Sequence, residues 1–450
     1  MQSEPIISVG ILTAPSIEFI LNGSFIASNG KKYTDGQKVE ASNGKIYFED
    51  ELFDELIFEP QSDDFSFDLL DVVIGIDFHW ERKENQRFKG ALKFIVSVQT
   101  RRASSPNLTA INHVKVEDYL TSVISSEMSA TASDELLKAH AVISRSWLLH
   151  PLQNAPVETR RASSPLESTK NPLIETIKIK WYERDAHAHF DVCADDHCQR
   201  YQGITRATTK AVEEAIAATR GEVLMYEDAI CDARFSKSCG GISETFENCW
   251  APISHPYLSK VIDNGQVPEG FEMDLTLEAN AEKWIRQSPS AFCNTQDAKV
   301  LSQVLNNYDQ ETTDFYRWKV EYTQAELSEL ISRRSGIDFG TIIDLIPVQR
   351  GESSRLIQLK IVGANQTLVV GKELEIRKWL SNSHLYSSAF VIDKSDIVNG
   401  IPGFFTLTGA GWGHGVGLCQ IGAAVMGEKG FSYDEILLHY FKAATLQLIY

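Results

Sequence analysis

Long apolar runs are absent from this sequence of 450 residues, and no stretch approaches the roughly 20 apolar residues that a membrane-spanning helix requires. The N-terminal stretch MQSEPIISVGILTAP also lacks a basic segment followed by a long apolar one, so we expect no secretory signal peptide. The chain has no surplus of basic residues either. It contains 43 Lys and Arg and 61 Asp and Glu, so its formal net charge is −18. This charge disfavours nucleic acid or an anionic membrane surface as the main partner, and it suits an uncharged polymer such as a glycan without peptide.

Cysteine is scarce, and its distribution argues against a disulfide framework. The seven cysteines are an odd number and are scattered along the chain: Cys193, Cys198, Cys231, Cys239, Cys249, Cys293 and Cys419. Cys193 and Cys198 lie close together and have histidines around them, which indicates a metal site.

The composition and length predict a globular protein of two or three domains, because 43% of the residues are hydrophobic. Residues 1–110 carry the signals of β structure. Asn-Gly pairs predict hairpin turns between short apolar runs, and they stand at residues 22–23, 29–30 and 43–44. Residues 71–79 and 88–98 predict longer buried strands.

Apolar residues recur at helical spacing from residue 116 to residue 128 and predict an amphipathic helix. Glu127 falls on the apolar face of this helix, although acidic residues belong on the wet side. Burial raises the pKa of a carboxyl group, which suits a general acid near neutral pH. From spacing alone, a solvated or salt-bridged glutamate at a helix end is the simpler interpretation. A second helix is predicted over residues 134–150, where Arg145 fits either a cleft position or an ion pair.

Thiol and imidazole side chains crowd into residues 187–198. Zinc prefers these ligands, and a structural zinc site takes four of them. A Cys2His2 set would consist of His187, Cys193, His197 and Cys198, with His189 as the competitor of His187. A reduced, metal-free cluster of buried thiols is the alternative interpretation.

The densest pattern in the chain is GAGWGHGVGLCQ at residues 409–420, with five glycines in twelve residues. Each glycine inside a helix or strand lowers stability relative to alanine, so this stretch predicts a tight loop whose backbone makes a close approach. Trp412 and His414 are the side chains that such a loop would present. A turn-rich loop around a core tryptophan is the alternative.

A second loop of small residues, FSKSCGGISET, occupies residues 235–245. Gly240 and Gly241 permit close backbone approach, and the hydroxyls of Ser236 and Ser238 can hydrogen-bond sugar hydroxyls or acetamides. Cys239 as a nucleophile has little support, because no order of neighbouring His and Cys residues resembles a protease.

These stretches resemble, in order, the stage II sporulation protein D family (SpoIID/LytB), whose members cut bacterial peptidoglycan or help to cut it. The resemblance rests on residues 116–149, 191–203, 235–245, 409–420 and the closing YDEILLHYF at 433–441. It implies an α+β protein, in which an N-terminal β-rich domain precedes a two-lobed mixed α/β module with a cleft between its lobes. The expected divisions are residues 1–110 for the N-terminal domain, 111–260 for the first part of the module, 261–405 for an inserted helix-plus-sheet lobe, and 406–450 for the C-terminal part with the glycine-rich loop.

The resemblance further implies lytic transglycosylation of peptidoglycan glycan strands. Glu127, directly before Met128, stands where such proteins carry their catalytic glutamate. The substrate-binding residues that it implies are Arg145, Ser236, Ser238, Gly240, Gly241, Trp412, His414 and Gln420. One structural Zn²⁺ and no organic cofactor are expected.

Two other functions stay open at this point. The first is a non-catalytic enhancer that binds the wall and stimulates a cell-wall amidase, in which Gln would be tolerated at position 127. The second is a zinc hydrolase, which is weaker because two thiolates make the metal a poorer Lewis acid. The family implies the cell envelope or periplasm, so the missing signal peptide would require a truncated start, another export route or a role inside the cell.

Overall fold

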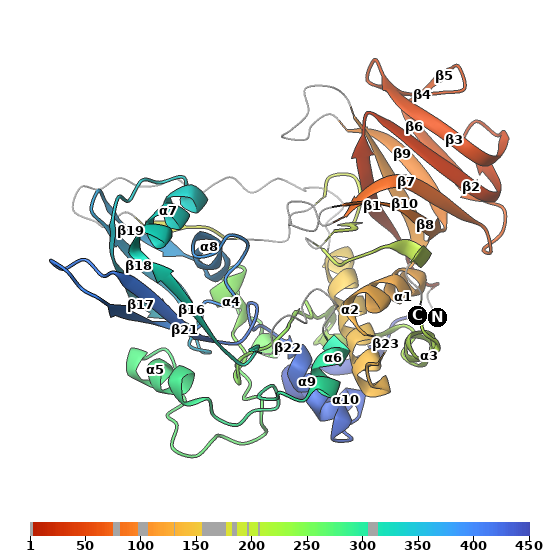
Figure 1. The fold of residues 1–450 in the computed structure, drawn as a ribbon. Coiled ribbons are helices and arrows are strands. Elements are labelled where there is room, and N and C mark those ends of the chain that lie inside the picture. Colours follow the sequence, from red (N-terminus) through yellow and green to blue (C-terminus); the bar gives the residue numbers. More distant parts are fainter. Residues whose placement is uncertain are drawn as a thin grey trace.

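A computed structural model of the chain describes residues 3–74, 82–97, 107–129, 131–154, 177–181, 187–195, 198–205, 208–304 and 314–450. Figure 1 shows three parts, which are a large N-terminal sheet, a central layer of helices and a second lobe of smaller sheets. Among the helices so described, none is both long and apolar enough to cross a membrane.

Within the described residues, the N-terminal sheet has eleven strands in the order β12-β1-β10-β9-β6-β2-β3-β4-β5, and β7 joins β2 to β8. All its pairings are antiparallel except that between β1 and β12. Its strands are β1 (Ile6–Ala14), β2 (Ser16–Ala27), β3 (Lys32–Ser42), β4 (Lys45–Phe48), β5 (Glu51–Phe53), β6 (Glu55–Pro60), β7 (Ser66–Ile74), β8 (Arg82–Lys89), β9 (Ala91–Ser97), β10 (Asn107–Lys115) and β12 (Val192–Cys193). Aromatic rings fill its core, where Phe19 contacts Phe58 and Phe94 at centroid distances of 5.2 and 5.1 Å.

Two of the predictions for this sheet are wrong. Asn22-Gly23 is no hairpin turn, because β2 continues through it with a register shift between Leu21 and Phe25. The single strand expected over 88–98 is broken at Gly90, whose φ of +83° is a conformation that favours glycine. A Cβ there would overlap the carbonyl oxygen of His113, so the chain turns at this glycine and β9 pairs with β10 instead of continuing β8.

The other two Asn-Gly pairs do form turns. Residues 28–31 join β2 to β3, and Asn43 and Gly44 join β3 to β4 with φ values of +51° and +75°. Positive φ at both central residues is the signature of the tight hairpin turn that Asn-Gly favours. For the strand expected over 71–79, β7 covers the part up to Ile74, and residues 75–79 lie outside the described residues.

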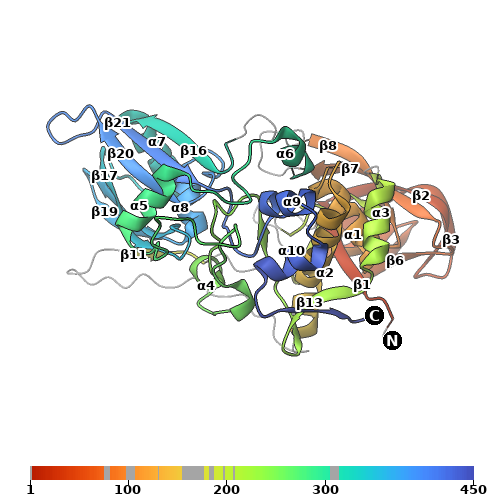
Figure 2. The ribbon, with the colours of Figure 1, turned by 90° about the horizontal axis from the view of Figure 1, so that it is seen from below.

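The central layer is built around α2, with α1 and α3 on one side and α9 and α10 on the other (Figures 1 and 2). Its helices are α1 (Val116–Glu127), α2 (Asp134–Asn154), α3 (Lys210–Ala218), α6 (Ala298–Val304), α9 (Gln420–Glu428) and α10 (Tyr433–Tyr440). A small sheet of β13 (Glu222–Tyr226), β14 (Ala229–Ile230) and β23 (Thr445–Leu448) adjoins them. The predicted helices over 116–128 and 134–150 are confirmed, and α2 extends four residues farther.

The second lobe packs two sheets with helices. One sheet has the order β11-β19-β18-β17 and the other β16-β21-β20. Its elements are β11 (Ile177–Ile179), α5 (Glu278–Gln287), β16 (Arg317–Thr323), α7 (Gln324–Ser335), β17 (Ile342–Arg350), β18 (Leu356–Gly363), β19 (Thr367–Gly371), α8 (Glu373–Trp379), β20 (Phe390–Ser395) and β21 (Phe404–Ala410). A capping box of Thr323 and Glu326 starts α7, and Gly336 in the left-handed conformation ends it.

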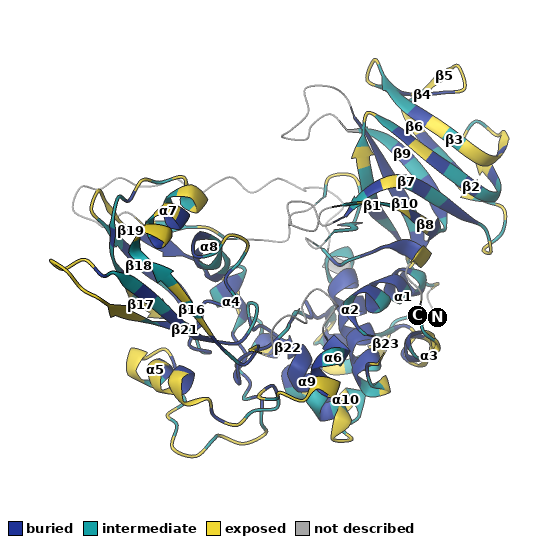
Figure 3. Ribbon diagram, viewed as in Figure 1, coloured by how far each residue is buried: buried dark blue, intermediate teal, exposed yellow. Residues whose placement is uncertain are grey.

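Short elements connect these parts: η1 (Gly203–Thr205), β15 (Phe235–Ser236), α4 (Phe246–Cys249), η2 (Pro256–Leu258) and β22 (Leu418–Cys419). Figure 3 shows that α1 and α2 are buried over most of their length, whereas exposed residues gather on β3 and on α5. A large antiparallel sheet followed by smaller sheets with helices confirms the predicted α+β class.

Candidate functional site

The two glycine-rich loops singled out in the sequence lie side by side. Strand β15 pairs in parallel with β22, and a bridge joins Ser238 to Trp412. The amide of Ser238 donates to the carbonyl of Trp412 at 3.1 Å, and the amide of Trp412 donates back at 2.8 Å. Residues 235–245 and 409–420 therefore form one paired-loop unit.

A buried arginine clamps this paired-loop unit from behind. Arg355 is only 1% exposed, and its guanidinium donates to the carbonyl of Cys239 on one loop and to that of Gly413 on the other, at 3.1 to 3.2 Å. Gly415 has a φ of +79°, and a Cβ there would overlap the guanidinium carbon. The glycines of the second loop thus give Arg355 room to reach the backbone.

A buried glutamate completes the clamp. Glu244 is 0% exposed, and its carboxylate accepts hydrogen bonds from the amide and the hydroxyl of Ser353 at 3.1 and 2.7 Å. The same hydroxyl accepts a hydrogen bond from Arg355 at 2.9 Å. A carboxylate and a guanidinium therefore share one serine, which reduces the cost of burying both charges.

The amides of the glycine-rich loop point into the protein. Gly411 donates to the carbonyl of Tyr316 at 3.1 Å, and Gly413 donates to that of Tyr386 at 2.7 Å. The carbonyl of Gly240 accepts from the Trp284 indole at 3.3 Å, and a Cβ at Gly241 would meet the same indole. These glycines shape the paired-loop unit through close packing, and their described hydrogen bonds are internal.

Trp412 is half-buried on the surface of the paired-loop unit. Its ring lies 4.3 Å from that of Tyr386 and 4.7 Å from that of Phe315, centroid to centroid. Contact with two aromatic rings fixes its orientation and leaves part of the indole in solvent.

His414 is held as a neutral ring. Its Nδ1 accepts a hydrogen bond from the amide of Val416 at 3.0 Å, so this nitrogen carries no proton. Burial lowers the pKa of His414 well below its usual value, and the positive charges of Arg234 and Arg355 lower it further. A histidine locked in this way orients the loop and is a poor proton donor near neutral pH.

Gln420 begins α9 and is bound to a second neutral histidine. Its side-chain amide lies 3.1 Å from Nε2 of His140 on α2, whose Nδ1 lies 3.2 Å from the hydroxyl of Ser144. Burial, followed by the charge of Lys237, lowers the pKa of His140 to about 3. Gln420 is 2% exposed, so it connects the paired-loop unit to α2.

The two serines of the first loop are buried as well. Ser236 is 7% exposed and packs against Gly413, and Ser238 is 0% exposed and accepts from the amide of Gly240 at 3.4 Å.

Glu127 is the last residue of α1 and is half-buried. The chain leaves the helix at Met128, and Ser129 then donates to the carbonyl of Gln303 at 3.0 Å. The ammonium of Lys237, which belongs to the first loop, donates to the neighbouring carbonyl of Val304 at 2.6 Å. The end of α1 and the paired-loop unit therefore meet at the last turn of α6.

Arg145 lies at the other end of α1. It forms a bidentate pair with Glu117 at 3.0 and 2.6 Å and is 0% exposed. Glu117 precedes Glu127 by ten residues, which at 1.5 Å per residue is ~15 Å of helix. The structure thus places Arg145 in a buried ion pair and does not bring it to Glu127.

The predicted metal ligands come together in part. Nε2 of His187 is 3.4 Å from Sγ of Cys198, and the amide of Cys193 donates to the same sulfur at 3.5 Å. The ligand atoms of His187, Cys193 and Cys198 lie within 4.8 Å of one another, so these three residues fit a zinc ion. His189 is exposed and does not belong to this group, and His197 lies outside the described residues.

A second group of ligand-type side chains was not predicted from the sequence. Cys239, Asp263, Cys293 and Cys419 meet in the interior, with their ligand atoms within 4.8 Å of one another. No local pattern in the sequence indicates the roles of Glu244 and Arg355 either. Partners so far apart in the chain leave no local spacing to detect.

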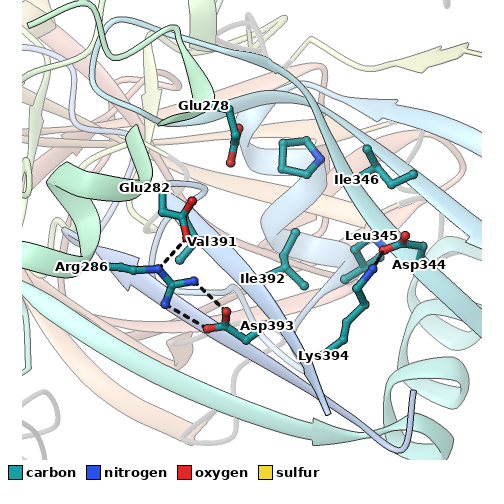
Figure 4. A pocket seen from close by; sticks show the side chains of 11 residues that line it. Glu278, Glu282, Arg286, Asp344, Leu345, Ile346, Val391, Ile392, Asp393 and Lys394 are labelled. Carbon is teal, nitrogen blue, oxygen red and sulfur yellow. Dashed lines mark hydrogen bonds and ion pairs between the residues drawn. The ribbon is translucent and has the colours of Figure 1, made fainter. Parts of the chain in front are cut away.

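A separate pocket of about 410 Å³ lies in the second lobe between α5, β17 and β20 (Figure 4). Its charged side chains are all held in ion pairs, and Glu278 pairs with Arg350 outside the pocket lining. Arg286 pairs with Glu282 and Asp393, and Lys394 pairs with Asp344. This pairing makes the pocket a weaker candidate than the paired-loop unit.

Two family models match the sequence. The one described as stage II sporulation protein matches residues 104–226, and the one described as a domain of unknown function (DUF8618) matches residues 244–417. The first range contains Glu127, and the second contains Glu244, Arg355 and most of the glycine-rich loop.

Several curated proteins are similar to this chain. Stage II sporulation protein D of Bacillus amyloliquefaciens is 23% identical over 353 residues, which are 78% of each chain. An uncharacterized protein of Brachyspira hyodysenteriae is 26% identical over 360 residues, 80% of this chain and 72% of that protein. The amidase enhancer of Bacillus subtilis is 27% identical over 251 residues, which are 53% of this chain and 32% of that protein.

Proposed function

We propose, from the premise that this chain carries a domain of the stage II sporulation protein D (SpoIID) family, that it cleaves peptidoglycan glycan strands by lytic transglycosylation. Glu127 is the single acid/base, and the bond cleaved joins N-acetylmuramic acid to N-acetylglucosamine. The division into an N-terminal β-rich domain and a two-lobed module with a substrate cleft is part of the same proposal.

The position of Glu127 supports this proposal best. Among the residues expected to serve the site, Arg145, Ser238 and Gln420 are at most 2% exposed. Glu127 is a carboxylate that remains half-exposed, at the point where α1 and the paired-loop unit meet. A polymer strand can reach such a group without unfolding the protein.

The proposed reaction balances with one carboxyl group. Glu127 in its acid form donates its proton to the glycosidic oxygen, and the bond from C1 of the muramic residue to that oxygen breaks. The resulting carboxylate takes the proton of the muramic 6-hydroxyl, whose oxygen attacks C1. The products are a free 4-hydroxyl on N-acetylglucosamine and a 1,6-anhydro ring, with no water consumed. Most other glycosidases require a second carboxylate, as nucleophile or as base for water.

The paired-loop unit would bind the strand. The exposed part of the Trp412 indole is a flat apolar surface on which a sugar ring can stack. We assign Ser236, Ser238, Gly240, Gly241, His414 and Gln420 to holding this surface in place, because their described contacts are internal. Arg145 pairs with Glu117 at the other end of α1, so we assign it to holding that helix in place.

One structural Zn²⁺ is proposed at His187, Cys193 and Cys198, with His197 as the expected fourth ligand. The segment that carries these ligands is already attached to the rest of the protein by hydrogen bonds. Strand β12, which contains Cys193, pairs with β1, and the amide of Gln202 donates to the hydroxyl of Ser122 on α1 at 3.0 Å. Zinc there would fix the loop over the helix that carries Glu127.

The alternative function is an amidase enhancer. The observation that favours it is the similarity to a protein of that name over 53% of this chain. In this function the chain would bind the wall and a partner N-acetylmuramoyl-L-alanine amidase, and Glu127 would be dispensable. Either function suits the cell envelope, which we propose as the location.

The deciding experiment uses purified glycan strands, with and without stem peptides, and the Glu127→Gln variant. Glu213→Gln, on the exposed face of α3, is the matched control. Release of soluble fragments by the wild type and the control, but not by Glu127→Gln, is expected. If none of the three proteins releases fragments while all of them bind strands, cleavage of glycan strands by this chain is excluded and the amidase-enhancer function remains.

A further inference from the structure

Three thiols and one carboxyl group meet directly behind the paired-loop unit. They belong to Cys239, Asp263, Cys293 and Cys419, which are at most 2% exposed. Their ligand atoms all lie within 4.8 Å of one another. All seven cysteines of the chain are free thiols, so no disulfide accounts for this cluster.

The spacing of the sulfur atoms fits a metal. Sγ of Cys239 is 3.8 Å from Sγ of Cys293. A tetrahedral zinc ion with Zn–S bonds of about 2.3 Å holds two sulfur ligands about 3.8 Å apart. The amide of Cys239 also donates to Sγ of Cys419 at 3.2 Å, and such a bond stabilises a thiolate.

The carboxylate is held in the orientation of a ligand. The hydroxyl of Tyr440 donates to Oδ1 of Asp263 at 2.5 Å, and the amide of Cys293 donates to Oδ2 at 2.8 Å. Both oxygens act as acceptors, which is the behaviour of an ionised carboxylate. An ionised carboxylate in the interior requires a compensating positive charge.

We propose that Cys239, Asp263, Cys293 and Cys419 bind one Zn²⁺ in a closed, structural site. Thiolates select zinc over the harder divalent ions, and four protein ligands leave no position for water or substrate. The site is separate from that of His187, Cys193 and Cys198.

The ion would fasten the paired-loop unit to the rest of the chain. Cys239 belongs to one loop, and Cys419 closes the other. Asp263 approaches from outside both, and its amide donates to the carbonyl of Gly241 at 3.0 Å. Zinc here would hold the two loops together in addition to the Arg355 clamp.

The test is the metal content of the full chain purified under reducing conditions. The double variant Cys193→Ser/Cys198→Ser removes the other candidate site and is expected to retain one zinc per chain. Adding Cys293→Ser to this double variant should lower the bound zinc per chain at least tenfold. Adding Cys231→Ser instead should leave the bound zinc unchanged, because that buried cysteine lies outside the cluster. A double variant that is folded, contains no zinc and takes up none from zinc chloride would overturn the proposal.

A second measurement does not depend on a variant that may misfold. The folded double variant, stripped by a chelator and reloaded with Co²⁺, should show the intense sulfur-to-cobalt absorption of several thiolates. Alkylation followed by peptide mass spectrometry should find Cys239, Cys293 and Cys419 protected by Zn²⁺. Unchanged alkylation of these cysteines, or a Cys239–Cys293 disulfide in the freshly purified chain, contradicts the proposal.

Discussion

Arg355 donates through both Nε and Nη2 to the carbonyl oxygen of Gly413, at 3.2 and 3.1 Å, from a position that is 1% exposed. A single buried side chain thereby fixes the backbone from which Trp412 and His414 project. The stability of the paired-loop unit should depend on this contact more than on any residue that faces solvent.

Replacing Arg355 by Met should lower the free energy of unfolding by about 3 kcal/mol or more. The carbonyls of Cys239 and Gly413 would lose their donors, and the buried carboxylate of Glu244 would lose the nearby cation. Urea denaturation measures the effect. Arg333→Ala on the exposed face of α7 is the control and should change stability by only about 0.5 kcal/mol. Equal changes in the free energy of unfolding for the two substitutions would contradict the proposed role of Arg355 in stabilising the two loops.

Gly415→Ala should destabilise the protein more than Gly336→Ala. Both glycines have positive φ, +79° and +70°, so each substitution carries the ~1 kcal/mol strain of a left-handed alanine. A Cβ at Gly336 meets open space, whereas one at Gly415 overlaps Arg355. The difference between the thermal unfolding midpoints of the two variants measures the cost of the overlap with Arg355. Identical midpoints would show that Arg355 does not approach Gly415 closely.

His140 should make the protein sensitive to acid. Its pKa is about 3 in the folded chain and about 6.5 when unfolded, so the unfolded state binds the proton more readily. The contribution of His140 is fully present above pH ~6.5 and is lost toward pH 3, by ~1.4 kcal/mol per pH unit. His140→Gln, which cannot be protonated, should flatten this dependence in denaturation experiments across that range. An unchanged slope would show that another group dominates.

Trp412→Phe should weaken binding to glycan strands about fivefold to tenfold, because phenylalanine retains the packing on Tyr386 and Phe315 but offers less surface to a sugar. The measurement is co-sedimentation with purified strands. Unchanged thermal stability of the variant is the control. Undiminished binding would remove Trp412 from the proposed binding surface.

Local signals in the sequence predicted much of the fold. Apolar residues at helical spacing specify α1, and Asn43-Gly44 specifies its own turn. Gly90 shows the limit of such signals, because its conformation is set by the carbonyl of His113 on another strand. The sequence alone could not show that this glycine ends β8.

The candidate site was predictable only in its conspicuous parts. The glycine-rich loop has an unusual composition, and Glu127 interrupts an apolar helix face. Arg355 has no such signal, because arginine is usually exposed and its backbone partners are distant in the chain. Cys239 and Cys293 are separated by 54 residues, so the cluster behind the loops follows from tertiary packing alone.

The most direct test of the central claim is the chemistry of the new strand ends. Purified glycan strands would be digested by the full chain in water enriched in heavy oxygen, and the ends would be identified by mass spectrometry. Lytic transglycosylation with Glu127 as the acid/base predicts 1,6-anhydro-muramic ends without heavy oxygen, and none from Glu127→Gln. Reducing ends that carry heavy oxygen, or anhydro ends that persist in Glu127→Gln, would contradict it.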